Sequence, residues 1–188
     1  WRTLGHGGRI MLKKILIGVA VLVAALLGLI ALQPSSFKVS RSAVITATPE
    51  AVFAQVNDFH NWEAWSPWAK LDPGVKNTFE GTPSGTGAIF KWAGNSKVGE
   101  GRMTLTESLP AQSIRIQLEF IKPFASTCDT TFAFAPGPDG VAVTWTMSGQ
   151  NDFLSKAFCL FMGDMDKMIG PDFERGLAQM KAVAEKKP

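Results

Sequence analysis

The longest uninterrupted hydrophobic segment of the chain runs from Ile15 to Leu32, eighteen residues without one charge. An apolar helix of about 20 residues spans the hydrocarbon core of a bilayer. A secretory signal usually has an apolar region of only about 7–15 residues, followed by a cleavage site with small residues. The residues from Gln33 to Phe37 offer no convincing site of that kind. We therefore expect an uncleaved transmembrane anchor, with a cleaved signal as the alternative.

Beyond the anchor, seven short segments have the features of β-strands, either β-branched residues between turn signals or an alternation of apolar and polar positions. In the clearest case, residues 113–121, Ile114 and Ile116 share one face with Leu118 and Phe120. Turn-forming residues separate the segments, such as Pro-Gly-Pro-Asp-Gly at 136–140. The expected strands cover residues 37–47, 75–80, 88–93, 97–106, 113–121, 126–135 and 141–148.

Helical signals occur at two places in the domain. Thr48-Pro49-Glu50 is typical of a helix start, and a second short helix is expected over residues 59–65. After the last strand the apolar spacing changes to three and four residues. This spacing predicts a helix over 153–167, an interruption at Gly170-Pro171, and a final helix to Lys186.

Strands followed by a long helix indicate an α+β domain. We expect a curved antiparallel sheet of about seven strands that wraps around the C-terminal helix, with two short helices after the first strand. The chain accordingly divides into residues 1–10, interpreted as a tag or an over-extended start, an anchor with a short linker at 11–36, and one domain at 37–188.

The charges predict the orientation of the anchor and exclude one class of partner. Four basic residues and no acidic residue precede Gln33: Arg2, Arg9, Lys13 and Lys14. This bias keeps the N-terminus in the cytoplasm and places the domain outside it, in the periplasm of a two-membrane bacterium. The rest of the chain has 15 basic and 16 acidic residues, a formal charge of −1. The isoelectric point near 9.0 thus reflects the flank of the anchor, and we expect no nucleic-acid partner.

Three stretches carry a resemblance to a known superfamily: RSAVITATPEAVFAQVNDFHNWEAWSPW (41–68), GTGAIFKWAGNSKVGEGRMTLTES (85–108) and MIGPDFERGLAQMK (168–181). The domain resembles START-related proteins, the SRPBCC or helix-grip class, and within it the bacterial polyketide cyclase/dehydrase-like branch. The resemblance implies a cavity between sheet and long helix that holds an apolar or amphipathic small molecule. Some relatives bind or transport lipids, some cyclise polyketides, and others act as chaperone partners. The family has no universal catalytic motif, so the resemblance assigns no catalytic residue.

Apolar side chains on the expected inward faces are the candidates for the wall of such a cavity, because aromatic and methionine residues suit an apolar ligand. These candidates are Trp92, Met103, Phe120, Phe132, Trp145, Met147 and Met165. For the tryptophans as a group, including Trp62, Trp65 and Trp68, core packing is the favoured interpretation. Trp92 and Trp145 are the better cavity candidates among them.

Groups for catalysis or metal binding are few. His60 is the only histidine after the anchor and would be the natural general base, but no acidic orienting residue is evident. Two cysteines and one histidine cannot form a closed metal site, and we expect no metal and no cofactor. Cys128 and Cys159 form no disulfide framework, although one bond between them is an alternative in an oxidising compartment.

The function expected first is membrane-tethered binding of a hydrophobic or amphipathic, lipid-like molecule, with no catalytic residue assigned. A second hypothesis is an enzyme of the polyketide cyclase or dehydratase type, for which His60 and Glu80 would be the first residues to substitute. A third is a non-catalytic module that interacts with a protein partner.

Overall fold

The computed structural model describes residues 6–186 of the chain. The chain divides into two compact units. One is formed by the residues up to Ser35 together with Asn151–Asp164, and the other by Ser36–Gln150 together with the residues from Met165 onward. Of the segment 1–10, residues 1–5 lie outside the described residues.

The first unit consists of two helices, α1 (His6–Ala31) and α4 (Phe153–Met162), which contact each other. Residues Met11–Ala31 of α1 are long and apolar enough to cross a membrane, by the same test that a signal sequence would pass. The Asp152 carboxylate caps α4 by accepting a hydrogen bond from the Ser155 backbone N–H at 2.7 Å. That bond lowers the pKa of Asp152.

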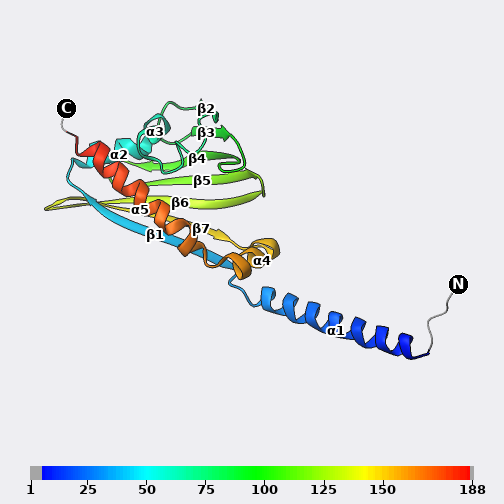
Figure 1. Cartoon of the computed structure of the whole chain (residues 1–188). Helices are drawn as coiled ribbons and strands as arrows, with labels where there is room; N and C mark the ends of the chain where they lie inside the picture. Colours follow the sequence, from blue (N-terminus) through cyan, green and yellow to red (C-terminus); the bar gives the residue numbers. More distant parts are fainter. Residues whose placement is uncertain (1–5, 187–188) are drawn as a thin grey trace. The chain divides into compact units, whose positions relative to one another are not determined.

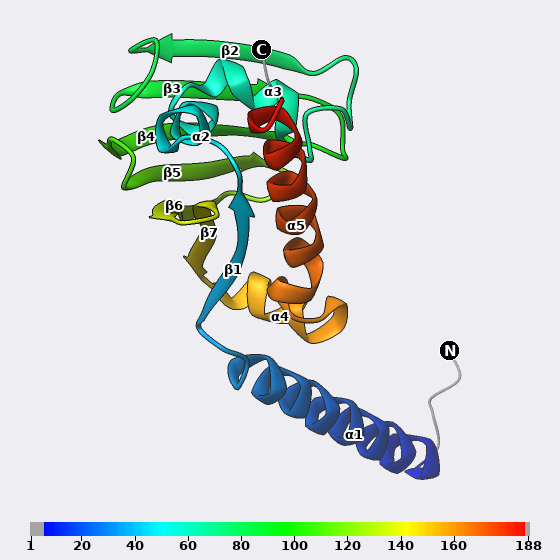
Figure 2. The same cartoon turned by 90° about the vertical axis from the view of Figure 1, so that its left-hand side faces the viewer.

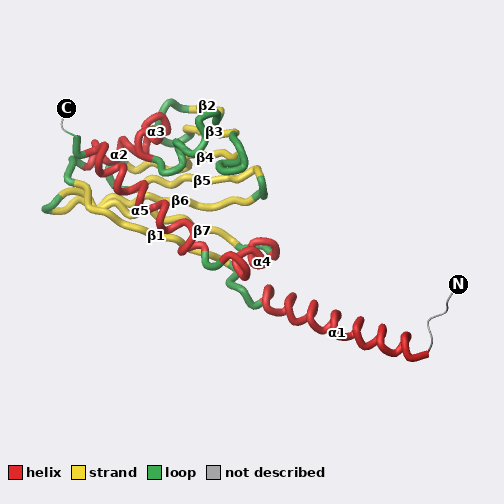
Figure 3. The backbone as a smooth tube through the Cα atoms, in the orientation of Figure 1, coloured by secondary structure: helices red, strands yellow, loops and turns green. Residues whose placement is uncertain are grey.

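The second unit contains one seven-stranded sheet in which all neighbouring strands are antiparallel (Figures 1 and 3). Its strands are β1 (Ser36–Ile45), β2 (Lys76–Gly81), β3 (Ala88–Ala93), β4 (Glu100–Leu109), β5 (Ser113–Lys122), β6 (Ser126–Gly137) and β7 (Gly140–Gln150). The spatial order is β1-β7-β6-β5-β4-β3-β2, so the first strand pairs with the last one. The expected α+β class and the seven strands are thereby confirmed.

Helices pack on one face of this sheet, which we call the inner face (Figure 2). They are α2 (Pro49–Asn57), the 3₁₀ helix η1 (Phe59–Asn61), α3 (Trp62–Trp65) and α5 (Met165–Ala184). The start of α2 is the predicted one, because the Thr48 hydroxyl accepts a hydrogen bond from the Ala51 N–H at 3.3 Å. The long helix α5 packs mainly along β1 and also contacts α3.

The expected break at Gly170-Pro171 is wrong. The helical segment is interrupted instead at Gly163, whose φ of +98° favours glycine, and α5 then continues through Pro171. A proline in a helix interior removes one backbone hydrogen bond and costs about 3 kcal/mol. Tertiary contacts counteract this cost, namely the burial of Phe173, Leu177 and Met180 in the core and the contacts from β1 described below, and a local pattern does not contain them.

The fourth strand also begins later than expected, at Glu100 instead of Lys97. The preceding residues form a turn that is held by the buried carboxylate of Asp72. This carboxylate accepts hydrogen bonds from the backbone N–H groups of Asn95 at 2.7 Å and Gly74 at 2.9 Å. These bonds lower the pKa of Asp72, and the bond from Asn95 holds the turn that precedes β4.

Candidate functional site

The inner face of the sheet is lined by every second residue of each strand. On β5 the side chains of Ile114 and Ile116 are fully buried, and those of Leu118 and Phe120, nearer the end of the strand, are only half-buried. The burial of this face therefore decreases toward the β5–β6 turn. The predicted alternation on β5 is confirmed.

An aromatic stack fills the buried part of the inner face. The ring of Trp145 on β7 lies between Phe173 of α5, with centroids 3.9 Å apart, and Phe132 of β6, at 5.0 Å. The edges of Trp65 and Trp68 approach the Trp145 ring, both at 5.7 Å. In this structure, aromatic side chains thus occupy the space between β7 and α5.

Two polar atoms of this buried region have no hydrogen-bond partner among the described residues. They are Nε1 of Trp145 and Oγ1 of Thr130, whose residues are only 2% and 4% exposed. Thr130 pairs with Met147, and Trp145 pairs with Phe132, so the two residues are diagonal neighbours on the inner face. A buried unsatisfied donor or acceptor costs about 1–3 kcal/mol and therefore calls for an explanation.

Arg41 brings a charge to the inner face and ties α5 to β1. Its guanidinium donates two hydrogen bonds to Asp166, at 2.7 and 3.0 Å, and one to Glu174 at 2.7 Å. Both interactions raise the pKa of Arg41, and the bond from Arg41 lowers the pKa of Asp166. Because Asp166 and Glu174 lie on opposite sides of Pro171, Arg41 holds together the two halves of α5.

An apolar surface remains partly open where the burial decreases. Four half-buried residues form it: Phe90, Trp92, Leu118 and Phe120, on β3 and β5. The rings of Phe90 and Trp92 stack with centroids 6.0 Å apart, and the edge of Phe120 meets Trp92 at 6.1 Å. Gly101 on β4 separates Trp92 from Phe120 in the pairing, and a Cβ there would collide with the Trp92 ring. We call these four residues the open apolar surface.

The seven predicted cavity residues fall into two groups. Phe132, Trp145, Met103 and Met147 are buried in the core, whereas Trp92, Phe120 and Met165 are half-buried against it. The structure brings Phe132 into contact with Trp145, and Trp92 into contact with Phe120. None of the seven lines either of the two pockets described next.

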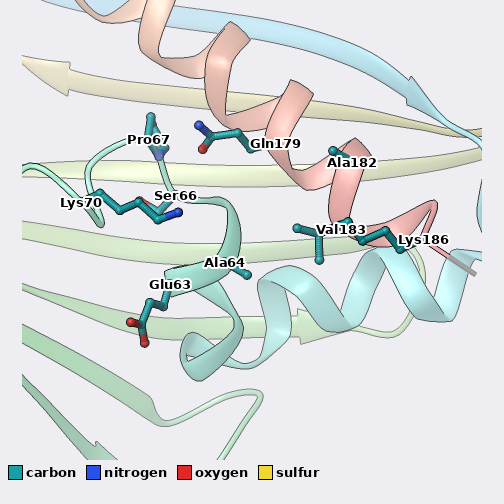
Figure 4. Close-up of a pocket in the computed structure, with 9 residues that line it drawn as sticks. All are labelled: Glu63, Ala64, Ser66, Pro67, Lys70, Gln179, Ala182, Val183 and Lys186. Atoms are coloured by element: carbon teal, nitrogen blue, oxygen red, sulfur yellow. The ribbon is translucent and has the colours of Figure 1, made fainter. Parts of the chain in front are cut away.

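The first pocket lies between α3 with the segment after it and the C-terminal part of α5 (Figure 4). Its volume is about 230 Å³, and its lining comprises Glu63, Ala64, Ser66, Pro67, Lys70, Gln179, Ala182, Val183 and Lys186. Such a small pocket with charged residues at its walls does not suit a large apolar ligand.

The second pocket, of about 260 Å³, includes His60 and Glu80 in its lining. The expectation that His60 has no acidic orienting residue is wrong. Its Nδ1 lies 2.7 Å from the carboxylate of Asp58, and its ring stacks on Phe79 with centroids 4.0 Å apart. The imidazole is nevertheless exposed, and the Glu80 carboxylate is paired with Lys91 at 2.7 Å.

Neither cysteine is bonded in this structure. Burial raises the pKa of the Cys128 thiol to about 11, and burial also raises that of Cys159. A Cys128–Cys159 disulfide stays a prediction that intact mass with and without reductant would test. Within residues 6–186, no three His, Cys, Asp or Glu side chains are grouped so as to hold a metal ion.

Sequence reasoning did not single out three residues that shape this region: Arg41, Thr130 and Phe90. Arg41 offered a signal, because a charged residue stands between Val39 and Ala43 on the inward face of β1. The lack of a partner for Thr130 depends on strand pairing and carries no signal in the sequence.

A curved antiparallel sheet that holds a long C-terminal helix and two short helices on its inner face defines the helix-grip class. Residues 36–185 match the family described as polyketide cyclase / dehydrase and lipid transport, and the chain belongs to this family. The resemblance noted in the sequence is confirmed. No curated protein matches this sequence.

Solved structures show the same fold. Protein CV1439 from Chromobacterium violaceum has a TM-score of 0.59 at 17% identity, over 80% of this chain and 98% of that chain. Protein MLL2253 from Mesorhizobium loti has a TM-score of 0.56 at 19% identity, over 79% and 99%. The di-domain ARO/CYC StfQ of the steffimycin biosynthetic pathway has a TM-score of 0.57 at 13% identity, over 80% and 51%. At these identities the likeness establishes the fold alone.

Proposed function

We propose that the domain binds one hydrophobic or amphipathic, lipid-like molecule on the inner face of its sheet, while α1 tethers it to a membrane. The observation that carries the proposal is the open apolar surface, which continues the core and is only half-buried. Removing apolar area from water is favourable by about 25 cal/mol per Å², before the entropic cost of association. An apolar ligand would gain this energy by covering Phe90, Trp92, Leu118 and Phe120.

The unpartnered atoms of Trp145 and Thr130 would give such a ligand its polar contacts. The indole Nε1 can donate only, and the Thr130 hydroxyl can donate or accept. A carbonyl or hydroxyl oxygen on an otherwise apolar molecule satisfies both. Since Trp145 is only 2% exposed and its Nε1 is buried, the ligand would reach the indole N–H only if the surrounding side chains shift.

The first experiment purifies the full chain in detergent, extracts it with organic solvent and identifies co-purified molecules by mass spectrometry. Lipid classes are then tested for thermal stabilisation of the protein. We expect a co-purified apolar molecule and stabilisation by its class. If no molecule co-purifies and no lipid class stabilises the protein, the proposal is refuted.

Matched variants on β5 test the open apolar surface. Leu118→Glu places a charge on the inner face, and Gln117→Glu places the same charge one residue earlier on the exposed outer face. We expect Leu118→Glu to abolish ligand stabilisation and Gln117→Glu to preserve it. Equal effects of the two variants would place the ligand elsewhere.

A second candidate function is a cyclase or dehydratase reaction at the pocket around His60, favoured by the Asp58–His60 contact. Asp58 would orient the imidazole, leaving Nε2 to exchange a proton with a substrate. StfQ, a structural neighbour, is described as an ARO/CYC protein of a biosynthetic pathway. Unchanged turnover of an aromatic polyketide substrate in the His60→Ala and Glu80→Ala variants would exclude this candidate.

A further inference from the structure

Helix α4 begins beside the residues that directly follow α1. Within their common unit, the backbone N–H of Asn151 donates a hydrogen bond to the Ser35 carbonyl at 2.8 Å. The side-chain amide of Asn151 donates another to the Pro34 carbonyl at 3.1 Å. Asn151 thus fixes the start of α4 beside the residues that follow the apolar helix.

The exposed side of α4 is apolar. Its most exposed side chains are Phe153 (55%), Leu154 (57%), Phe158 (44%) and Phe161 (70%). At about 100° per residue, these four positions fall within an arc of about 140°. The polar side chains of Ser155 and Lys156 lie outside this arc and are less exposed. A helix on the surface of a soluble domain has the opposite arrangement.

We propose that α4 lies in the interface of the bilayer spanned by α1, with Phe153, Leu154, Phe158 and Phe161 in the lipid. This inference rests on the tethering part of the proposed function. Ten residues of helix are about 15 Å long, too short to cross a bilayer. A short helix whose aromatic face is exposed, and which begins at the end of a membrane span, fits a position in the plane of the interface.

The charges around α4 indicate whether it would bind a membrane through anionic headgroups or through burial of its apolar side chains. Lys156 is the only basic residue of α4, and Asp152 and Asp164 flank the helix. There is accordingly no basic face to attract anionic headgroups. The helix would bind through apolar burial, and neutral phosphatidylcholine suffices.

The test uses the full chain with Cys128→Ala and Cys159→Ser, reconstituted in phosphatidylcholine vesicles. An environment-sensitive fluorophore is attached to one new cysteine at a time: Phe161→Cys on the apolar face, Lys156→Cys on the polar side, or Val23→Cys within α1. Quenching by nitroxide-labelled acyl chains reports lipid contact, and quenching by aqueous iodide reports water contact.

We expect lipid quenching at positions 161 and 23 and iodide quenching at position 156, at low and high salt alike. Lipid quenching at 23 with iodide quenching at 161 would overturn the inference and leave the tether standing. Iodide quenching at 23 would refute the tether and the inference together. A probe at 161 shielded from both quenchers would show a protein contact in place of lipid, which also overturns it. Ligand binding is measured separately, so its failure would not affect these outcomes.

Discussion

The guanidinium of Arg41 donates two hydrogen bonds to the carboxylate of Asp166, from Nη1 to Oδ1 at 2.7 Å and from Nη2 to Oδ2 at 3.0 Å. This planar two-point contact joins the strand that starts the domain to the helix that ends it. A further contact, from Nε to Glu174, reaches the other side of Pro171. Arg41 therefore supports α5 on both sides of its internal proline.

We expect Arg41→Lys to lower the midpoint of thermal unfolding, because a lysine ammonium cannot make the planar contact with Asp166 and reach Glu174 at the same time. Hydrogen exchange should increase in the first turns of α5. Lys38→Arg, on the exposed side of the same strand, is the control and should leave both measurements unchanged. Equal protection of α5 in Arg41→Lys and the unmodified protein would contradict this role.

Replacing Pro171 should stabilise the protein. Pro171→Ala restores a backbone donor in the interior of α5 and removes a ring that crowds the preceding turn, with a gain of about 1–3 kcal/mol in the free energy of unfolding. Chemical denaturation measures the gain. Combining Pro171→Ala with Arg41→Lys tests the link: the loss caused by Arg41→Lys should shrink once the proline is gone.

Gly176 should not tolerate even alanine, although alanine favours helices by about 1 kcal/mol. A Cβ at this position would stand 2.8 Å from the ring of Trp145 and 3.0 Å from Pro67. Such overpacking costs about 1–3 kcal/mol, so Gly176→Ala should destabilise the domain in denaturant titrations. Ala178→Gly, at an exposed position of the same helix, calibrates the helix propensity. A stabilised Gly176→Ala variant would refute the close approach.

Acid should destabilise the domain through Asp72 and Asp166, whose pKa values are lowered in the folded state. A lowered carboxyl pKa stabilises the fold at pH values above the unfolded pKa, which is about 3.9. This stabilisation disappears as the pH falls from there through the folded pKa. Melting temperatures between about pH 7 and pH 2 should therefore decline mainly below about pH 4, and less steeply in Asp72→Asn.

The control for this pH dependence is Asp129→Asn, because Asp129 is exposed on the outer face of β6. Its profile should follow that of the unmodified protein. An Asp72→Asn profile as steep as that of the control would show that the turn at residues 94–99 does not depend on the charge of Asp72.

Much of the fold was predictable because it is encoded locally. The alternation along residues 113–121 and the capping sequence at Thr48 are each complete within a few residues, and both predictions are confirmed. The break at Gly170-Pro171 was wrong for the opposite reason. α5 is supported on both sides of Pro171 by tertiary contacts, among them those of Arg41, more than 100 residues away in the sequence.

The candidate site was predictable only in part. Strand parity placed Trp92 and Trp145 on the inner face, but it cannot tell a residue packed against a helix from one left half-buried. That difference depends on where α3 and α5 settle on the sheet. The Asp58–His60 contact, in contrast, joins residues two positions apart and was accessible from the sequence.

The clustered tryptophans give the protein a spectroscopic signal of its own. Trp62, Trp65, Trp68 and Trp145 form a chain of ring contacts with centroids 4.6 to 6.4 Å apart. Indoles at such separations couple their electronic transitions, and fixed aromatic packing is what near-ultraviolet circular dichroism records. Any molecule that enters beside Trp145 must disturb this coupling. The spectrum of the unlabelled protein can therefore report occupancy directly, without a dye and whatever the chemical identity of the ligand.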